Sequence, residues 1–280
     1  MRLALFALAL ALAACGGEEF SVVGVGGAGA GGSSSGGSSS GGAGGGAGSG
    51  GGAGSGGSST CRALKFDGVD DVVRVPDHAE LDGLGQLTVE AWVFPESYPN
   101  EVHVLSHHDH NAMTGYALLM YEGSEMQFRY QFGGQMHSAG FTPVAAQAWH
   151  HVAATHDGST VRLFVDGAQR HQQKIAPGVA ADCKAPLSIG GAAYEDNFPF
   201  RGTIDEVRLS RIARYSADFT PSKQPFAVDA DTVALWHFDE ESGQAVTDAT
   251  GQHPGTLGKT SALEGPDPER VPVSCQLGGG

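Results

Sequence analysis

Short runs of apolar or alternating residues, separated by Gly- and Asp-rich turns, fill most of the chain after residue 61, a pattern typical of antiparallel β-strands. The runs predict strands at residues 63–66, 72–75, 87–94, 103–106, 116–121, 126–132, 149–156, 160–166, 186–191, 203–210 and 232–238. Segments between them, such as DGVDD and HDGS, favour hairpin turns. A helical period is missing, apart from a turn or two near RIARYSADF. We therefore predict an all-β domain, an antiparallel β-sandwich or jelly roll.

The chain begins with MRLALFALALALAAC, whose apolar run is far shorter than the roughly 20 residues of a membrane-spanning helix. Its length and flanks predict a secretory signal peptide over residues 1–15. The closing LAAC resembles the lipobox of bacterial lipoproteins, which implies cleavage before Cys15 and lipidation of its sulfur. The alternative is an ordinary signal peptide with a chance cysteine. Because Gly16 lacks the aspartate that favours inner-membrane retention in lipoprotein sorting, we expect a lipid-anchored protein of the outer membrane or cell surface.

Residues 16–60 are almost entirely Gly, Ser and Ala. Such a segment buries too little apolar surface to offset the conformational entropy lost on ordering it. We predict a disordered linker that holds a folded head away from the membrane.

The net charge of the chain is −15. Binding to phosphate groups needs clusters of Lys and Arg, so this charge argues against nucleic acid and anionic membrane surfaces as partners. Contact with the membrane is therefore expected through the lipid alone.

Five motifs carry a resemblance to a known family. In chain order they are LKFDGVDDVVRV, LTVEAWVFP, WHHVAATHDGSTVRLFVDG, LSIGG and FRGTIDEVRLSRIARY. Together they resemble the bacterial laminin-G-like domain, a jelly roll of the concanavalin A-like lectin/glucanase superfamily, over roughly residues 62–258. The resemblance implies two antiparallel sheets packed face to face. It also implies a cell-surface head that recognises a glycan or a cell-envelope or extracellular protein.

The segment TVALWHFDEESGQAVTDATGQHPGTL (residues 232–257) resembles the strand and loop that precede the LKFDG strand in many family members. It is either a truncated second repeat or the missing edge of the same sandwich. So short a segment cannot bury a core alone, so we expect residues 232–258 to complete the sandwich. The domain then spans residues 61–258, and residues 259–280 form a C-terminal tail.

Three cysteines remain beyond the lipobox, and outside the cytoplasm two of them can form a disulfide. The family arrangement just described places the end of the chain beside its first strand. This implies a Cys61–Cys275 disulfide that ties the two ends of the domain together, with Cys183 left free. The alternative is a disulfide that uses Cys183.

The chain lacks a recognisable catalytic motif. Glucanases of the superfamily carry E-x-D-x-x-E along one strand, where alternate carboxylates reach the same cleft. Here the adjacent Asp205 and Glu206 are expected on opposite faces, and Glu90 stands alone in its strand. In the strand-rich region after residue 61, a Gly-x-Ser-x-Gly elbow, a His-Glu-x-x-His motif and a Gly-rich phosphate loop are all missing. We predict that the protein is not an enzyme; a polysaccharide-acting hydrolase with an unrecognised site is the alternative.

Asp205 faces the apolar side of its predicted strand, where a carboxylate needs a partner. The expected neighbour is the first strand with its FDGVDD turn, because the end strands of such jelly rolls lie together. Oxygen ligands gathered from two segments are those that Ca²⁺ prefers. One interpretation is therefore a structural Ca²⁺ held by Asp67, Asp70 and Asp205. The other is an Asp205 that accepts backbone N–H bonds with no ion.

Histidines concentrate in the segment His103–His110, which also contains Asp109. Imidazoles and carboxylates are zinc and copper ligands, so metal capture by this segment is one hypothesis. His107, His108 and His110 contain no i, i+4 pair that would preorganise two ligands on a helix, however. The segment also falls at a variable hairpin loop of the family, which favours a solvated or ligand-contacting loop. The loop at residues 190–202 offers aromatic, carboxylate and amide groups that suit sugars, although an ordinary polar loop explains it too. The candidate ligand-binding residues are His107, His108, Asp109, Tyr194, Asp196 and Asn197. His78 and His253 stand in or beside turns and receive no role.

Overall fold

The computed structural model describes most of the chain after residue 60. The described residues are 61–109, 111–112, 114–121, 124–132, 135–176, 182–192, 198–258 and 267–277. The predicted signal peptide, the lipidation site Cys15 and the predicted linker lie outside these ranges. Within them, none of the helical structure is long and apolar enough to cross a lipid bilayer.

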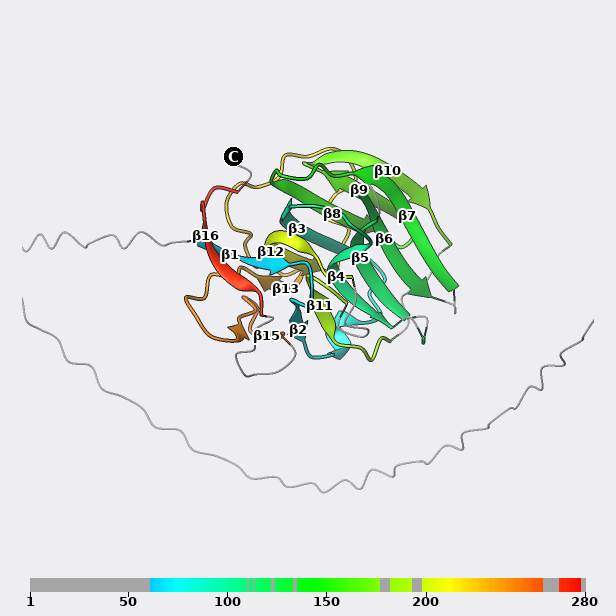
Figure 1. Ribbon diagram of the computed structural model, residues 1–280. Coiled ribbons are helices and arrows are strands. Elements are labelled where there is room, and N and C mark those ends of the chain that lie inside the picture. Colours follow the sequence, from blue (N-terminus) through cyan, green and yellow to red (C-terminus); the bar gives the residue numbers. More distant parts are fainter. Residues whose placement is uncertain are drawn as a thin grey trace, which may run out of the picture. The chain divides into compact units, whose positions relative to one another are not determined.

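The described strands form two antiparallel sheets (Figure 1). Sheet A contains, in spatial order, β10 (Ala168–Lys174), β9 (Thr160–Val165), β8 (His150–His156), β3 (Leu87–Pro95), β12 (Arg201–Ser210), β1 (Cys61–Asp67) and β16 (Glu269–Val273), and β13 (Thr232–Trp236) also pairs with β12. Sheet B contains β14 (Ala245–Val246), β15 (Gly255–Leu257), β2 (Val73–Val75), β11 (Leu187–Ile189), β4 (Val102–Asp109), β5 (Thr114–Tyr121), β6 (Glu125–Phe132) and β7 (Gln135–Pro143). A single 3-10 turn, η1 (Ala79–Leu81), follows β2. The predicted antiparallel β-sandwich is confirmed.

Alternate residues of the two sheets meet in one apolar core. β3 contributes Val89 and Val93, and β5 contributes Leu118 and Met120, all of them inaccessible to solvent. Burying an aliphatic side chain of this size stabilises a fold by roughly 1.5–3 kcal/mol. The alternation of apolar residues that predicts the strands is therefore also what joins the two sheets.

Residues 232–257 contribute strands to both sheets. In sheet A, β13 pairs with β12 and sets Trp236 opposite Val207. In sheet B, β15 pairs with β2 and sets Leu257 opposite Val73, and β14 pairs with β15. Trp236 is fully buried in the core. This segment is thus part of the same sandwich as the strands that precede it.

The segment predicted as a C-terminal tail, residues 259–280, contains strand β16, so that boundary is wrong. β16 pairs with β1 and lies beside it in Figure 1. The predicted Cys61–Cys275 disulfide is confirmed, with Cα atoms 5.1 Å apart, and Cys183 is a buried free thiol. The sequence of β16, ERVPV, does not predict a strand because it contains a proline. Proline is tolerated here because β16 lies at the edge of the sheet.

Two longer strands, β7 and β10, are also missing from the predicted set. The sequence of β10 is AQRHQQK, and this strand lies at the other edge of sheet A. An edge strand with both faces exposed needs no apolar alternation, so the pattern that finds core strands does not find it. The helical turn predicted near RIARYSADF is wrong, since residues 211–219 form bends without a helix.

Candidate functional site

The connection between β2 and β3 carries several groups that can bind a metal ion. Its sequence begins PDHAELD, residues 76–82. Leu81 is fully buried, and the Tyr116 hydroxyl donates a hydrogen bond to the Leu81 carbonyl at 3.1 Å. His78 caps η1, because its Nδ1 accepts a hydrogen bond from the Glu80 N–H at 3.3 Å. The core therefore fixes the backbone from which the polar side chains of this connection project.

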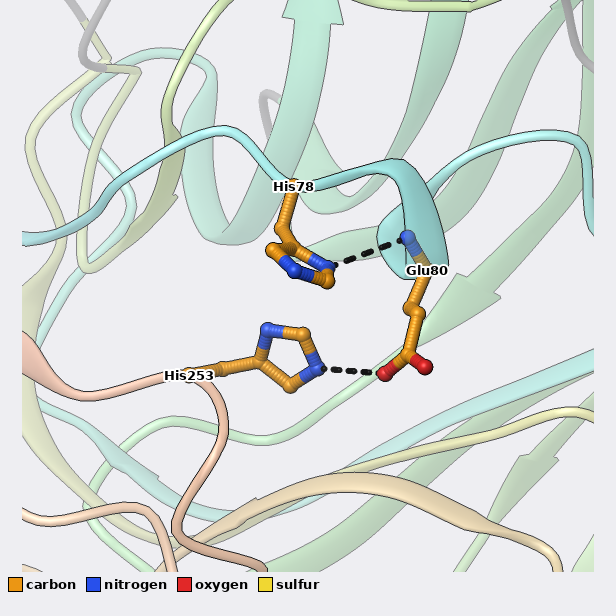
Figure 2. Close-up of side chains that lie close together, drawn as sticks. All are labelled: His78, Glu80 and His253. Atoms are coloured by element: carbon orange, nitrogen blue, oxygen red, sulfur yellow. Dashed lines mark hydrogen bonds and ion pairs between the residues drawn. The ribbon is translucent and has the colours of Figure 1, made fainter. Parts of the chain in front are cut away.

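His78, Glu80 and His253 form one cluster, which we call the His78–His253 cluster. Figure 2 shows His78 and Glu80 on the β2–β3 connection facing His253, which lies on the connection between β14 and β15. One potential ligand atom from each residue lies within 4.8 Å of the other two. The two imidazole rings are 4.9 Å apart, and His253 Nε2 is 3.4 Å from Glu80 Oε2. Residues from distant parts of the sequence thus present nitrogen and oxygen donors to one point.

His253 is the buried member of this cluster. Its side chain is enclosed, with the residue only 2% exposed; Nδ1 makes no hydrogen bond, and Nε2 has only the long contact to Glu80 Oε2 at 3.4 Å. Its backbone is held firmly: the N–H donates to Asp248 Oδ2 at 2.9 Å, and the carbonyl accepts from Trp236 Nε1 at 3.0 Å. Burial lowers the pKa of His253, against the opposing charge of Asp248. The ring is therefore neutral at pH 7, the form that binds metals.

Asp77, Asp82 and His107 form a second cluster on the same connection. His107 is fully buried, and its Nε2 is 3.1 Å from Asp82 Oδ1, which also accepts from the Cys183 N–H at 2.8 Å. Burial alone would raise the pKa of Asp82, but the bonds from His107 and Cys183 outweigh it and lower this pKa. Asp77 Oδ1 and Asp82 Oδ2 are buried without a hydrogen bond. This oxygen-rich set is a second group that can hold a cation.

The ligand loop predicted at His107, His108 and Asp109 is instead the end of β4, so its placement in a loop is wrong. Pairing with β5 continues to Asp109, opposite Thr114, and it carries the His107 ring to within 5.5 Å of the ring of Tyr116. Asp109 closes the following turn by accepting hydrogen bonds from the N–H groups of residues 111 and 112, each at 2.9 Å. His110, Tyr194, Asp196 and Asn197 lie outside the described residues.

The predicted calcium ligands Asp67, Asp70 and Asp205 are not brought together. The pairing of β1 with β12 sets Asp67 opposite Arg201, at the start of β12, whereas Asp205 lies near its centre. Asp205 Oδ1 accepts the Glu206 N–H at 2.8 Å instead. Among the described residues, no group of potential metal ligands includes any of these three aspartates. The first strand is the neighbour of β12, as expected, but this register sets the turn that follows Asp67 beside the start of β12 and not beside Asp205.

A β-bulge at Glu206 buries two neighbouring carboxyl groups. The register between β12 and β3 shifts between Asp205 and Arg208, and Glu206 has φ of 50°. Strict alternation would place these adjacent residues on opposite faces of the strand. Both are nevertheless buried, with Asp205 3% and Glu206 2% exposed. Burial raises the pKa of Asp205 to about 8, and the charge of Glu206 adds to this effect. Asp205 is therefore protonated at neutral pH.

Glu90, the remaining candidate for a catalytic carboxylate, is enclosed in a buried network. Arg208 Nε donates to its Oε1 at 2.8 Å, and the Tyr215 hydroxyl donates to its Oε2 at 2.7 Å. His151 Nε2 lies 3.1 Å from the same Oε2. Burial opposes ionisation of Glu90, but His151 and Arg208 outweigh it and lower its pKa. The network ties Tyr215, in the segment that follows β12, to β3 and β8.

Replacing Glu90 by Gln is expected to lower the free energy of unfolding by about 3 kcal/mol, because it leaves the Arg208 charge buried without its counter-charge. Urea unfolding measures this change. Glu96→Gln is the matched control, since Glu96 pairs with a half-exposed Lys65 at 3.4 Å and should contribute only about 0.5 kcal/mol. Equal losses in the two variants would contradict a stabilising role for the network.

Apart from these clusters, a partly exposed surface forms where β4, β6 and the end of the β11–β12 connection meet. We call it the Glu101–Arg129 surface; it consists of Glu101, His103, Tyr121, Arg129 and Phe198. The His103 ring stacks on the Phe198 ring at 4.7 Å, and the His103 N–H donates to the Phe198 carbonyl at 3.0 Å. The two elements from which ligand contacts are predicted, the histidine segment and the loop at 190–202, therefore touch here.

Charge on this surface is paired. Both terminal guanidinium nitrogens of Arg129 donate hydrogen bonds to the Glu101 carboxylate, one of them to Oε2 at 2.8 Å. His103 Nε2 lies 2.8 Å from Glu101 Oε1. Burial alone would raise the pKa of Glu101, but His103 and Arg129 lower it, so the carboxylate is ionised. Tyr121, 38% exposed, has its ring 6.0 Å from the Arg129 guanidinium carbon.

Comparison with known families identifies the sandwich. The profile of the concanavalin A-like lectin/glucanases superfamily, in its Laminin_G_3 form, matches residues 67–218, more than half of the chain. The chain belongs to this family.

Several solved structures are similar to this one. One is a proposed carbohydrate-binding protein from Bacteroides ovatus ATCC 8483, with 17% identity and a TM-score of 0.59 over 78% of this chain and 61% of that one. Domains LG4-5 of the mouse laminin alpha1 chain have 17% identity and a TM-score of 0.44 over 58% of this chain and 48% of theirs. The CBM40 of Ruminococcus gnavus IT-sialidase has 15% identity and a TM-score of 0.44 over 55% of this chain and 92% of its own. This chain thus spans only about three fifths of the Bacteroides protein. No curated protein matches the sequence.

Proposed function

We propose that the protein is a non-catalytic glycan-binding module, carried at the bacterial cell surface by a lipid on Cys15. The observation that carries this proposal is the Glu101–Arg129 surface. A carboxylate and a guanidinium locked together present fixed hydrogen-bonding groups, and Tyr121 and Phe198 add aromatic faces beside them. Small-ligand sites combine apolar and aromatic contact with a few fixed polar groups in this way. Membership of the family and the fold shared with the Bacteroides protein support the same function.

The carboxyl groups support a binding role over hydrolysis. A glycosidase places two carboxyl groups across an open cleft, one as acid and the other as base or nucleophile. In this chain Glu90 is enclosed by Arg208 and His151, and the bulge buries Asp205 and Glu206. These three carboxyl groups are therefore enclosed within the fold and do not face each other across an open cleft.

The proposed lipid anchor and linker determine where this module is located and how it is attached. The LAAC sequence supports lipidation at Cys15 and an outer-membrane or cell-surface location, and the Gly/Ser-rich residues 16–60 support a flexible tether. A tethered head can sample a glycan layer around its anchor without a fixed orientation.

A glycan array probed with soluble protein that starts at residue 16 tests the binding proposal. We expect binding to a defined glycan class, and Tyr121→Ala and Arg129→Met should each weaken it at least tenfold, which corresponds to about 1.4 kcal/mol. Val228→Ala is the control, because Val228 is an exposed apolar residue outside the surface, 46% accessible. Thermal melting confirms that each variant is folded.

Two results would contradict the proposal. Glycan binding that survives both substitutions would place the site elsewhere. Binding to no glycan, together with capture of an envelope or extracellular protein that Tyr121→Ala abolishes, would assign the surface to a protein partner instead.

A further inference from the structure

We propose that His78, Glu80 and His253 form a zinc site that clasps the β14–β15 connection to the β2–β3 connection. Two imidazoles and one carboxylate are the donor set of many zinc sites with three protein ligands, in which water takes the fourth position. Their potential ligand atoms already lie within 4.8 Å of one another. Zn–N and Zn–O bonds of about 2.0–2.2 Å place such atoms roughly 3–3.5 Å apart, so small side-chain rotations complete the site.

The state of His253 is the second observation that points to a ligand. The buried His253 ring makes no hydrogen bond at Nδ1, and its Nε2 has only a long contact to Glu80 Oε2, at 3.4 Å. The bonds from Trp236 and to Asp248 nevertheless hold its backbone in place, so the ring is presented rather than free to turn away. Figure 2 shows this ring directed at the gap between it and the two residues of the β2–β3 connection. A metal ion would give this ring a direct bond in place of its long contact with Glu80.

The other two ligands are accessible and can adjust. His78 and Glu80 are exposed, so an ion can enter from solvent. The hydrogen bond to His78 Nδ1 is long, at 3.3 Å, so the ring gives up little when it turns to bind metal. Glu80 Oε2 already faces His253 Nε2 at 3.4 Å, close to the separation of two ligands on one ion.

The donor set selects the type of metal. Ca²⁺ takes six to eight oxygen ligands, and the His78–His253 cluster offers a single carboxylate. Nitrogen-rich sites favour Zn²⁺ and its transition-metal neighbours instead. The family profile ends at residue 218, so it covers His78 and Glu80 but not His253. The site thus depends on a residue that lies beyond the part of the chain that matches the profile.

Calorimetric titration of the chelator-treated, soluble full-length head with Zn²⁺ and with Ca²⁺ tests the proposal. We expect one Zn²⁺ per chain and no Ca²⁺ at the same concentrations. Zn²⁺ at 100 times its Kd should raise the Tm by about 5–10 °C. His78→Ala and Glu80→Gln lie on the exposed side of the cluster and should keep the fold, and each should weaken zinc binding at least tenfold.

Two controls separate this cluster from other histidines. His171→Ala removes an imidazole from the edge strand β10 and should leave zinc binding unchanged. His107→Asn tests the neighbouring Asp77–Asp82–His107 cluster and should also leave it unchanged. The proposal is overturned if zinc fails to bind, if it binds equally well to His78→Ala and Glu80→Gln, or if only His107→Asn abolishes binding.

Discussion

Replacing both Cys61 and Cys275 by Ser is expected to lower the free energy of unfolding by about 5 kcal/mol. The disulfide joins residues separated by 214 positions, and closing so long a loop removes a large part of the entropy of the unfolded chain. The native strands β1 and β16 keep their backbone pairing without it, so the variant should still fold. Urea unfolding of the oxidised protein and of the variant measures the difference.

The buried thiol of Cys183 provides the control for this experiment. Cys183→Ser also exchanges sulfur for oxygen, but it removes no disulfide because Cys183 is a free thiol. Any decrease in the free energy of unfolding of this variant therefore measures the cost of a buried hydroxyl alone. Reducing agent should destabilise the oxidised protein by a similar amount and leave the double variant unaffected. A double variant as stable as the oxidised protein would show that strand pairing alone secures the two ends.

Replacing Asp205 by Asn is expected to raise the free energy of unfolding by about 4 kcal/mol at pH 7. The folded state raises the pKa of Asp205 from 3.8 to about 8, chiefly through burial. Between these values the native chain holds a proton that the unfolded chain has released, so native stability falls by about 1.4 kcal/mol per pH unit as pH rises. Asn cannot ionise, and its side-chain oxygen can still accept the Glu206 N–H.

The pH dependence makes this prediction specific. The variant and the parent should be equally stable near pH 4, and the advantage of the variant should grow up to pH 8. Asp239→Asn is the control, because that exposed carboxylate interacts with Asp205 yet should itself change stability by less than about 0.5 kcal/mol. An Asp205→Asn variant that is less stable than its parent, and a parent that Ca²⁺ stabilises, would restore the calcium interpretation.

The strands that line the core could be predicted because their apolar residues repeat with the period of a strand. The runs at 87–94 and 116–121 became β3 and β5 almost residue for residue. The edge strands β10 and β16 could not be predicted, since an edge strand requires neither apolar alternation nor a full set of backbone donors. The disulfide followed from the family resemblance, which set the last segment beside the first.

The sites were harder to predict, because side chains meet through the fold rather than through spacing. Nothing in the sequence links His78 to His253; only the packing of the C-terminal segment beside β2 brings them together. The bulge at Glu206 likewise decides that Asp205 is buried, and adjacent acidic residues in a strand do not reveal a bulge. His107 was expected in a loop because the apolar pattern of its strand ends before it. The strand continues, however, because β5 pairs with the polar residues of β4 as far as Asp109.

The position of β1 has a mechanical consequence. Any pull on the chain before Cys61 enters the domain through a strand that lies between β12 and β16 rather than at an edge. For a pull along the strand axis, the hydrogen bonds on both sides of β1 are loaded together, whereas an edge strand is held by hydrogen bonds on one side alone. The covalent link to Cys275 makes β16 share the load from the outset. A pull on the N-terminal end of the domain is therefore resisted by β12, β1 and β16 together.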